Sequence, residues 1–373
     1  MRDDVNNAPG DRPGPPPPLR SRKRLDPEIF QLPVEKMRRG YYSDKYFTRS
    51  RDVLLATGFD PHVTMQIFQK KRAWLGGIDE AIAILKLCLT KGYRWEDLEV
   101  LALYDGDRIE PWEPVLQITG PYAAFAHLET LLLGVLSRRT KVATNTRAVV
   151  EAAWPKPVMF FPARHDHWLV QTGDGYAAHI AGAIGVSTDA QASWWGSEGI
   201  GTVPHALIAC YGGDTVRATK AMADTLPPDV RVISLVDFDN DCVGTALAVA
   251  RALGPRLHGV RLDTSETMVD RSIVPQMGRF DPRGVNPQLV WNVRHALDAE
   301  GFQHVQIVVS GGFDAEKIRR FEELGVPVDM YGVGSSLFKG SYDFTGDIVM
   351  VEGKPLAKAG RRYQPNPRLE RVT

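Results

Sequence analysis

Residues 305–336 read VQIVVSGGFDAEKIRRFEELGVPVDMYGVGSS, and this stretch decides the fold. Val305–Val309 and Val328–Tyr331 are short apolar runs rich in β-branched residues, which is typical of buried strands. Between them, Ala315–Leu324 is predicted to be a helix, since an aspartate precedes it as N-cap and a glycine follows it as a stop. A strand, a helix and a second strand in this order favour parallel pairing with the helix outside the sheet.

The same alternation extends upstream to about residue 147. Apolar runs predict strands at Val158–Phe161, Val232–Val236 and Val260–Leu262, and the stretches between them predict helices at Val243–Leu253 and Pro287–Ala299. We therefore predict an α/β fold in which residues 147–339 form an irregular α/β barrel of parallel strands. In such barrels the working residues lie where strands end and loops begin.

The rest of the chain has different signals. Residues 39–146 mix apolar positions at helical spacing with short alternating runs, and predict a small N-terminal α+β domain. Residues 340–373 are expected to form a C-terminal extension that packs on this domain. Residues 1–38 combine a Pro15–Pro18 run with many basic residues and few large apolar ones, so we expect a disordered, Pro/Arg-rich tail.

The overall composition excludes several classes of protein. Among 373 residues, 45 basic side chains balance 45 acidic ones, so nothing global attracts the chain to nucleic acid or to an anionic membrane. The three cysteines lie far apart and form no CxxC pair, which argues against a disulfide framework. The longest apolar runs are too short for a membrane span, and we expect a cytoplasmic protein.

Polar and glycine residues follow the predicted strands and should converge on one rim of the barrel. Backbone amides of the SGG and GVGS loops can approach an anion closely, and the first loop leads into a helix N-terminus, so we predict a phosphate cradle there. The rim residues are Arg164, Asp237, Asp239, Arg261, Asp263, Ser310, Gly311, Gly312, Gly332, Gly334 and Ser335.

Arg261 lies within a strand-like run, and a guanidinium in a barrel mouth is costly unless an anion pairs with it. A carboxylate or phosphate ligand is one interpretation. The other is an internal ion pair with Asp263 or Asp237. His205 lies in a glycine-bounded apolar segment, where a lone histidine is more often a core residue than a catalyst.

Two segments of the sequence partly match metal-binding patterns. The run VDFDNDC supplies the first three acidic positions of an EF-hand loop but has Cys242 and Ala248 where that loop needs glycine and glutamate. His165 and His167 have the H-x-H spacing of zinc ligands, but the spacing of the other residues does not identify a third ligand. We therefore assign no protein-bound metal, and expect the acids after Val236 to meet ribose hydroxyls or magnesium carried by a polyphosphate.

Six ordered motifs between Tyr41 and Phe338 together resemble the nicotinate phosphoribosyltransferase family of type II phosphoribosyltransferases. They are SDKY, QITGPYAAFAHLETLLLGVLSRRTKVATN, GTVPHA, GVRLDTSE, SGGFD and GVGSSL. The resemblance implies a glycosyltransferase of the ligase type that makes nicotinate mononucleotide and pyrophosphate from nicotinate and phosphoribosyl pyrophosphate, in NAD salvage. It also implies magnesium bound with pyrophosphate, ATP as a co-substrate, and a homodimer with shared active sites.

Roles follow from the resemblance by position. Tyr46 would stack on the pyridine ring, often from the neighbouring subunit, while Thr202 and Arg261 would bind nicotinate. His205 would be phosphorylated by ATP, and Asp237 would lie close to the ribose and ring. Residues that would meet the phosphates are Arg164 and the loop residues Ser310, Gly311, Gly312, Gly332, Gly334 and Ser335.

The chain departs from the family pattern before the catalytic histidine, where Pro204 replaces a small residue and the spacing is closer to the shorter, archaeal-type members. Alternatives are a related nicotinamide or quinolinate phosphoribosyltransferase, and a phosphate-binding α/β barrel lyase or isomerase. The last would have no need of the SDKY aromatic residue, and a catalytically silent scaffold is a further, weaker option.

Overall fold

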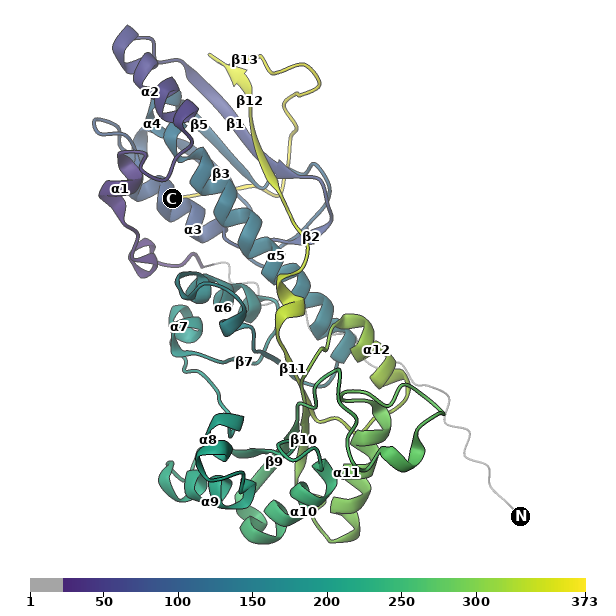
Figure 1. The fold of residues 1–373 in the computed structure, drawn as a ribbon. Helices are drawn as coiled ribbons and strands as arrows, with labels where there is room; N and C mark the ends of the chain where they lie inside the picture. Colours follow the sequence, from purple (N-terminus) through teal and green to yellow (C-terminus); the bar gives the residue numbers. More distant parts are fainter. Residues whose placement is uncertain (1–22) are drawn as a thin grey trace.

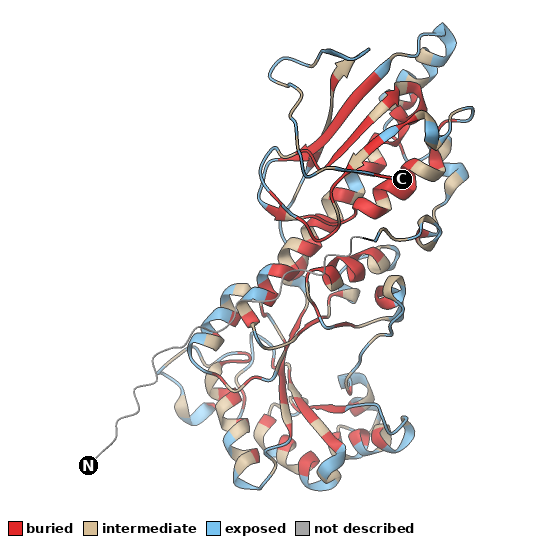
Figure 2. Cartoon of the chain, turned by 180° about the vertical axis from the view of Figure 1, so that it is seen from behind, coloured by how far each residue is buried: buried red, intermediate tan, exposed pale blue. Residues whose placement is uncertain are grey.

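The computed structural model describes residues 23–373. Two lobes are joined by the long helix α5 (Glu129–Ala153), which runs from the N-terminal lobe to the parallel-sheet lobe (Figure 1). Buried residues follow the strands of both sheets and the inner faces of the helices (Figure 2). Each lobe has its own large hydrophobic core, and α5 contributes side chains to both.

The C-terminal lobe contains a six-stranded sheet in which every neighbouring pair is parallel. The strand order is β7 (Gly185–Val186), β6 (Val158–Phe160), β11 (Met330–Val333), β10 (Gln306–Val309), β9 (Leu257–Leu262) and β8 (Val232–Leu235). Within residues 23–373 no ladder joins β7 to β8, so the sheet is curled and open at one side. The predicted irregular α/β barrel is confirmed in this half-barrel form.

Among the helices that pack against this sheet, the three that follow β8, β9 and β10 begin at a side chain that caps them. They are α10 (Cys242–Leu253), α11 (Pro287–Ala299) and α12 (Ala315–Glu323). Asp241 accepts from the amide of Gly244, and Asn286 accepts from the amide of Leu289. Asp314 accepts from the amides of both Glu316 and Lys317, as its predicted N-cap position requires.

The N-terminal lobe is an antiparallel sheet with helices on one face. Its strand order is β13 (Lys354–Pro355), β12 (Phe344–Val351), β1 (His62–Gln69), β5 (Leu116–Pro121), β3 (Glu99–Ala102) and β14 (Glu370–Arg371). Helix α3 (Ile78–Cys88) shares the hydrophobic core with this sheet. The C-terminal residues belong to the sheet, since β12 pairs with β1 and β14 pairs with β3.

The remaining α-helices and a small third sheet complete the two lobes. Helices are α1 (Val34–Arg38), α2 (Lys45–Thr57), α4 (Tyr122–Phe125), α6 (Gln171–Ile180), α7 (Asp189–Ala192), α8 (His205–Cys210) and α9 (Thr215–Thr225), and a two-stranded sheet joins β2 (Ala73–Trp74) to β4 (Arg108–Ile109). Helix α5 passes without a break through the boundary expected at residues 146 and 147. No helix in residues 23–373 is long and apolar enough to cross a membrane.

The expectation of disorder for residues 1–38 is wrong for residues 24–38. Arg24 forms an ion pair of 3.0 Å with Asp79, whose other oxygen accepts from the amide of Leu25 at 2.9 Å. The ring of Phe30 is buried, with its centroid 4.7 Å from that of Trp194. This segment folds because it finds partners far away in the sequence. The Pro15–Pro18 run lies outside the described residues.

Candidate active site

The carboxyl ends of the parallel strands bring the predicted rim residues together, because parallel strands all end at the same edge of a sheet. Arg261 lies in β9, Asp237 follows β8, and Ser310 follows β10. The contacts among these residues show which of them form one site and which do not.

Arg261 is held by three neighbours at the centre of this rim. Its Nε donates to Ser310 Oγ at 2.8 Å, and its Nη1 donates to Thr202 Oγ1 at 3.2 Å. Its Nη2 lies 3.4 Å from Asp263 Oδ2, so the internal ion pair considered from the sequence is present. A guanidinium has five N–H donors, and this arrangement leaves about two of them free for a ligand. The side chain is 21% exposed, so an anion can reach it.

Phe161 is a rim residue that the sequence analysis missed. It follows β6 and is half-buried, and the centroid of its ring lies 5.2 Å from Cζ of Arg261. A Cβ atom on Gly332 would meet the same ring at 2.6 Å, so only glycine fits beneath Phe161. The apolar run Val158–Phe161 was interpreted as a buried strand, and nothing in that pattern shows that its last ring faces the site.

The SGG loop after β10 has the backbone of an anion cradle. Gly311 and Gly312 have φ values of +83° and +66°, the left-handed region that side chains other than glycine rarely adopt. Lys317, from the first turn of α12, donates to the carbonyl of Gly311 at 3.4 Å, and burial lowers the pKa of its ammonium group. The exposed carboxylate of Glu266 lies against Gly312, so an anion that binds this loop must displace it.

Ser310 links the cradle to the arginine. Its hydroxyl donates to Asp263 Oδ1 at 2.6 Å and accepts from Arg261, and the residue is buried.

On the second loop, a Cβ atom on Gly334 would lie 3.0 Å from the ring of His165. Partial burial and the neighbouring Arg164 lower the pKa of His165, which favours its neutral form.

His205 and Asp237 form a pair at the same edge. Nε2 of His205 lies 3.0 Å from Asp237 Oδ1. The imidazole at the start of α8 is 45% exposed, whereas the carboxyl group is only 7% exposed. Burial raises the pKa of Asp237, and the nearby His205 opposes that rise. The carboxylate therefore orients an accessible imidazole whose other ring nitrogen is free to react.

The single chain leaves two predicted site residues outside this cluster. Arg164 lies in the exposed turn after β6, and none of the residues 23–373 forms an ion pair with it. Tyr46 lies on α2, is 60% exposed, and packs beside Phe47. Helix α2 is at the far end of the N-terminal lobe from β9 (Figure 1).

The two metal patterns have other partners in the structure. Asp241 caps α10 and pairs with Arg271 at 3.0 Å, while His167 accepts from the amide of Leu169 and stacks on Trp168. No cluster of three or more potential metal-binding His, Cys, Asp or Glu side chains occurs among the described residues.

A buried carboxyl group lies near Tyr46 at the start of α5. Glu129 is 9% exposed and faces Gly346 of β12. Burial raises its pKa to about 8, and the carboxylates of Asp347 and Asp44 add to this rise. The folded protein therefore keeps this group protonated well above the pH at which an unfolded chain ionises it.

Replacing Glu129 by glutamine is expected to make the protein more stable at alkaline pH. A carboxyl group whose pKa is raised from 4.5 to about 8 on folding stabilises the fold at low pH, and this contribution is lost as pH rises through that window. The loss is on the order of 3 to 5 kcal/mol, and the glutamine is neutral throughout. Urea unfolding of wild type and Glu129→Gln at pH 5 and pH 8.5 measures it. Equal pH dependence in both proteins, or the same gain from the exposed control Glu323→Gln, would contradict the assignment.

Comparison with known proteins supports this description of the fold. The family model for the N-terminal domain of quinolinate phosphoribosyl transferase matches residues 44–140. The solved structure of nicotinate-nucleotide pyrophosphorylase from Pyrococcus furiosus is 33% identical, with a TM-score of 0.76 over 91% of this chain and 85% of that one. The structure of human nicotinic acid phosphoribosyltransferase has a TM-score of 0.63 at 18% identity, covering 84% of this chain and 75% of that one, and shows a shared fold.

These similarities place the fold in the class of pyridine phosphoribosyltransferases. Among proteins known by sequence, nicotinate phosphoribosyltransferase pncB1 of Mycobacterium tuberculosis is 32% identical over 274 residues, which cover 70% of this chain and 56% of the relative. The chain belongs to the nicotinate phosphoribosyltransferase family. It spans about half the length of the curated relatives that it matches.

Proposed function

We propose that the protein is a nicotinate phosphoribosyltransferase, which forms nicotinate mononucleotide and pyrophosphate for NAD biosynthesis in the cytoplasm. The observation that carries this proposal is the position of the Arg261 guanidinium. Ser310 holds it beside the SGG loop, and about two of its N–H donors have no partner among the described residues of the site. Nicotinate offers one carboxylate to this arginine, and a sugar 5′-phosphate suits the glycine cradle. The two anions would then lie in one site, with the pyridine nitrogen near the sugar.

The proposed reaction needs positioning and charge stabilisation more than covalent chemistry. The bond between C1′ and the pyrophosphate oxygen breaks, the pyridine nitrogen forms the new bond to C1′, and pyrophosphate leaves with the electron pair. Arg261 and Thr202 would fix the carboxylate, while Phe161 offers a ring face beside it. Holding both reactants in line supplies much of the rate acceleration.

The charge of the pyrophosphate would be met by magnesium and by basic side chains. We expect the ion to arrive bound to phosphoribosyl pyrophosphate, with phosphate oxygens among its ligands. Arg164 is exposed in the turn after β6, and we assign it to the leaving group. Loop residues Gly332, Gly334 and Ser335 would complete the seat of the 5′-phosphate.

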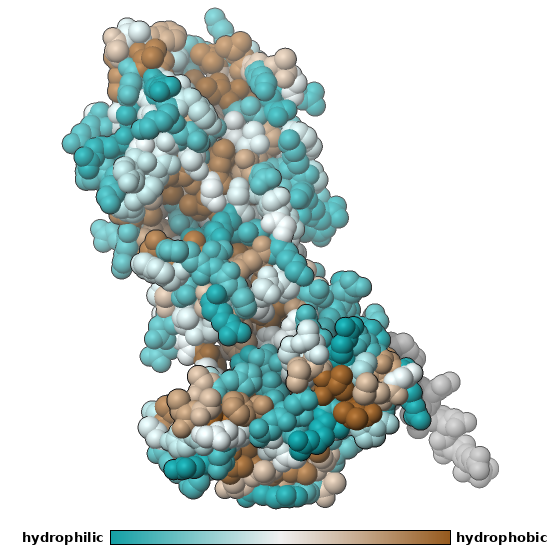
Figure 3. Space-filling view, viewed as in Figure 1, coloured by the Kyte–Doolittle hydropathy of each residue, from teal (hydrophilic) through white to brown (hydrophobic). Residues whose placement is uncertain are grey.

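A homodimer would complete the site. Tyr46 cannot serve Arg261 of its own chain from the far end of the N-terminal lobe, but it can serve the neighbouring chain. Large apolar side chains are exposed on α2 and on the segments that flank it, with Tyr41 73%, Val53 59% and Phe59 64% exposed. Hydrophobic side chains gather at this end of the molecule in Figure 3. An apolar patch of this kind is typical of a protein interface.

ATP would act through His205. The ring nitrogen that does not face Asp237 attacks the γ-phosphorus of ATP, ADP leaves, and the phosphohistidine is later hydrolysed to inorganic phosphate. The buried carboxylate of Asp237 supports this step, because it stabilises the positive charge that develops on the imidazole. Coupling of this kind would drive nucleotide formation.

Replacing His205 by alanine is expected to abolish stimulation by ATP and to leave slow transfer. The imidazole would carry the phosphoryl group, whereas Arg261 and the glycine loops hold the reactants. Initial rates with and without ATP measure both activities, and Asp237→Asn should reduce the stimulation partly. Loss of both activities to the same extent, or of neither, would count against the role.

Product formation from radiolabelled nicotinate and phosphoribosyl pyrophosphate, with and without ATP, tests the proposal. Labelled nicotinate mononucleotide is the expected product. The second candidate is a quinolinate phosphoribosyltransferase, which the match to that family's N-terminal domain favours. If the protein releases carbon dioxide from carboxyl-labelled quinolinate and does not use nicotinate, the quinolinate phosphoribosyltransferase is the correct candidate. A barrel lyase or isomerase would consume neither pyridine.

A further inference from the structure

A cavity lies in the N-terminal lobe, on the face of the antiparallel sheet that is turned away from the hydrophobic core. Met65 and Ile67 of β1 point into that core, whereas Gln66 and Phe68 line the cavity. Its volume is about 420 Å³, within the range of small-molecule sites. The C-terminal residues 360–364 form its other wall, so the cavity exists because the end of the chain returns to this sheet.

The cavity is held open by hydrogen bonds that fix this returning segment. Nε2 of Gln66 donates to the carbonyl of Gln364 at 2.8 Å and to Oε1 of Gln117 at 3.0 Å. Oε1 of Gln66 accepts from the amide of Gln364 at 3.0 Å. Gln66 is 1% exposed, so these bonds are shielded from water. The wall is therefore preformed and does not have to order when a ligand binds.

One side of the cavity is aromatic. The rings of Phe68 and Trp112 lie 5.5 Å apart at 33°, and Trp112 remains 39% exposed. Trp112 has a φ of +69°, a left-handed conformation that residues other than glycine rarely adopt. Its amide donates to the carbonyl of Gln69 at 2.7 Å, which holds this backbone in place. Strained residues of this kind cluster at ligand sites.

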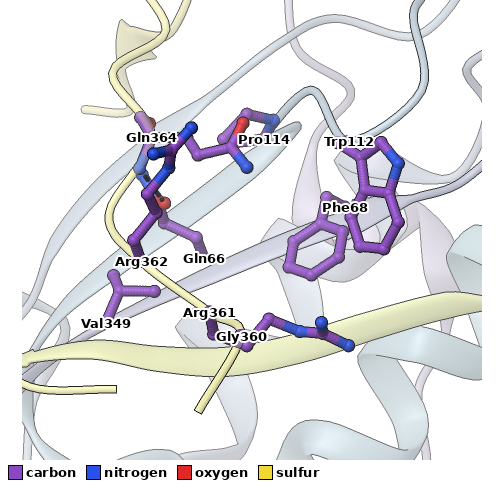
Figure 4. Close-up of a pocket in the computed structure, with 9 residues that line it drawn as sticks. All are labelled: Gln66, Phe68, Trp112, Pro114, Val349, Gly360, Arg361, Arg362 and Gln364. Carbon is purple, nitrogen blue, oxygen red and sulfur yellow. Dashed lines mark hydrogen bonds between the residues drawn. The ribbon is translucent and has the colours of Figure 1, made fainter. Parts of the chain in front are cut away.

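The other side is cationic. Figure 4 shows Arg361 extending toward the two rings and Arg362 across the cavity beside Gln364. Arg361 lies 5.4 Å from the ring centre of Trp112, and its Nε donates to Asp347 at 2.6 Å, so its charge is balanced. Arg362 is exposed, and none of the described residues accepts a hydrogen bond from it. No carboxylate is among the residues lining the cavity, which leaves Arg362 free for an anion.

We propose that this cavity binds a nucleoside monophosphate, with the base against Trp112 and the phosphate at Arg362. A ring face accepts a planar base, and a free guanidinium accepts two phosphate oxygens at once. The volume exceeds what a pyridine acid alone would fill, and the site uses none of the residues of the barrel rim. The protein would thus carry a nucleotide site in addition to its reaction centre.

Hydrogen exchange followed by mass spectrometry tests this proposal on the full chain, with AMP as the probe. AMP should slow exchange in segments 108–116 and 358–366, and adenosine or inorganic phosphate at the same concentration should do so much less. Arg362→Gln should weaken the AMP effect at least about tenfold, because it removes a charged hydrogen-bond donor. The control Arg319→Gln, on the exposed face of α12, should behave as wild type.

The two segments report on this cavity alone, while peptides over Ser310–Gly312 report separately on the rim. A failed assay of pyridine transfer would therefore leave this result standing, and the reverse also holds. No protection by AMP in the two segments would overturn the proposal, as would equal protection in Arg362→Gln. Protection without nucleotide that grows with protein concentration would also overturn it, since a second copy would then cover the cavity.

Discussion

Replacing Arg261 by glutamine should lower kcat/KM for nicotinate by about two to three orders of magnitude and leave turnover of nicotinamide, where measurable, nearly unchanged. The guanidinium has about two donors free for a carboxylate, and each charged hydrogen bond contributes roughly 1.5 to 3 kcal/mol. Glutamine keeps a donor near Ser310 but has no charge. The ratio of kcat/KM for the two pyridines isolates the contribution of Arg261 to carboxylate binding, because the sugar phosphate is common to both reactions.

Structural collapse would mimic the loss, so the unfolding midpoint of Arg261→Gln must be compared with wild type. Ser310 still donates to Asp263 in the variant, which keeps that carboxylate partnered. Arg319→Gln serves as the matched control, since it removes an exposed arginine from the same lobe. An unchanged preference for nicotinate in Arg261→Gln would show that another cation recognises the carboxylate. Wild-type protein that uses both pyridines equally would contradict the assignment from the start.

Mixing two inactive variants should restore activity if the sites are shared. Tyr46→Ala and Arg261→Gln each impair every site of their own dimer. Reassembly of an equal mixture gives heterodimers with one intact site, formed by Tyr46 of one chain and Arg261 of the other. About a quarter of the wild-type activity is expected after complete exchange of subunits.

The control for this experiment is a pair of variants within one lobe. Thr202→Ala and Arg261→Gln both change the barrel rim, so none of their heterodimers has an intact site. Refolding from urea, followed by the transfer assay, provides the exchange. Recovery in the control pair, or none in the Tyr46 pair at full dimer assembly, would refute a site built from two chains.

Local signals in the sequence predicted much of the parallel lobe. The helix expected at Pro287–Ala299 has those bounds, because Asn286 caps it and proline suits its first turn. The strand expected at Val305–Val309 differs by one residue, and Asp314 caps the following helix. Alternating apolar strands and helices, punctuated by such caps, are enough to define parallel topology.

Contacts between distant residues could not be predicted in this way. The pairing of β12 with β1 joins segments some 280 residues apart. No local sequence pattern specifies which distant strand will pair with β1. Arg24 and Phe30 lie in a segment of disorder-like composition, yet Asp79 and Trp194 fix them. Phe161 ends a run that is otherwise buried, so its composition indicated core packing, whereas its position at the rim depends on the glycine beneath it.

The candidate site shows the same division. Position at a strand end was enough to find Arg261, Asp237 and Ser310. The sequence left open whether Arg261 meets a ligand or an internal acid, and the geometry shows that the guanidinium contacts Asp263 and still has donors free. The pairing of His205 with Asp237 depends on how the loop before α8 turns back toward β8, which no spacing rule gives.

A crystal structure with bound nicotinate mononucleotide tests the central claim most directly. We predict that its carboxylate lies within hydrogen-bonding distance of Arg261, while its 5′-phosphate contacts the amides of Gly311 and Gly312 and displaces Glu266. A nucleotide bound away from this rim, or one whose carboxylate meets a different cation while Arg261 stays on Asp263, would contradict the account.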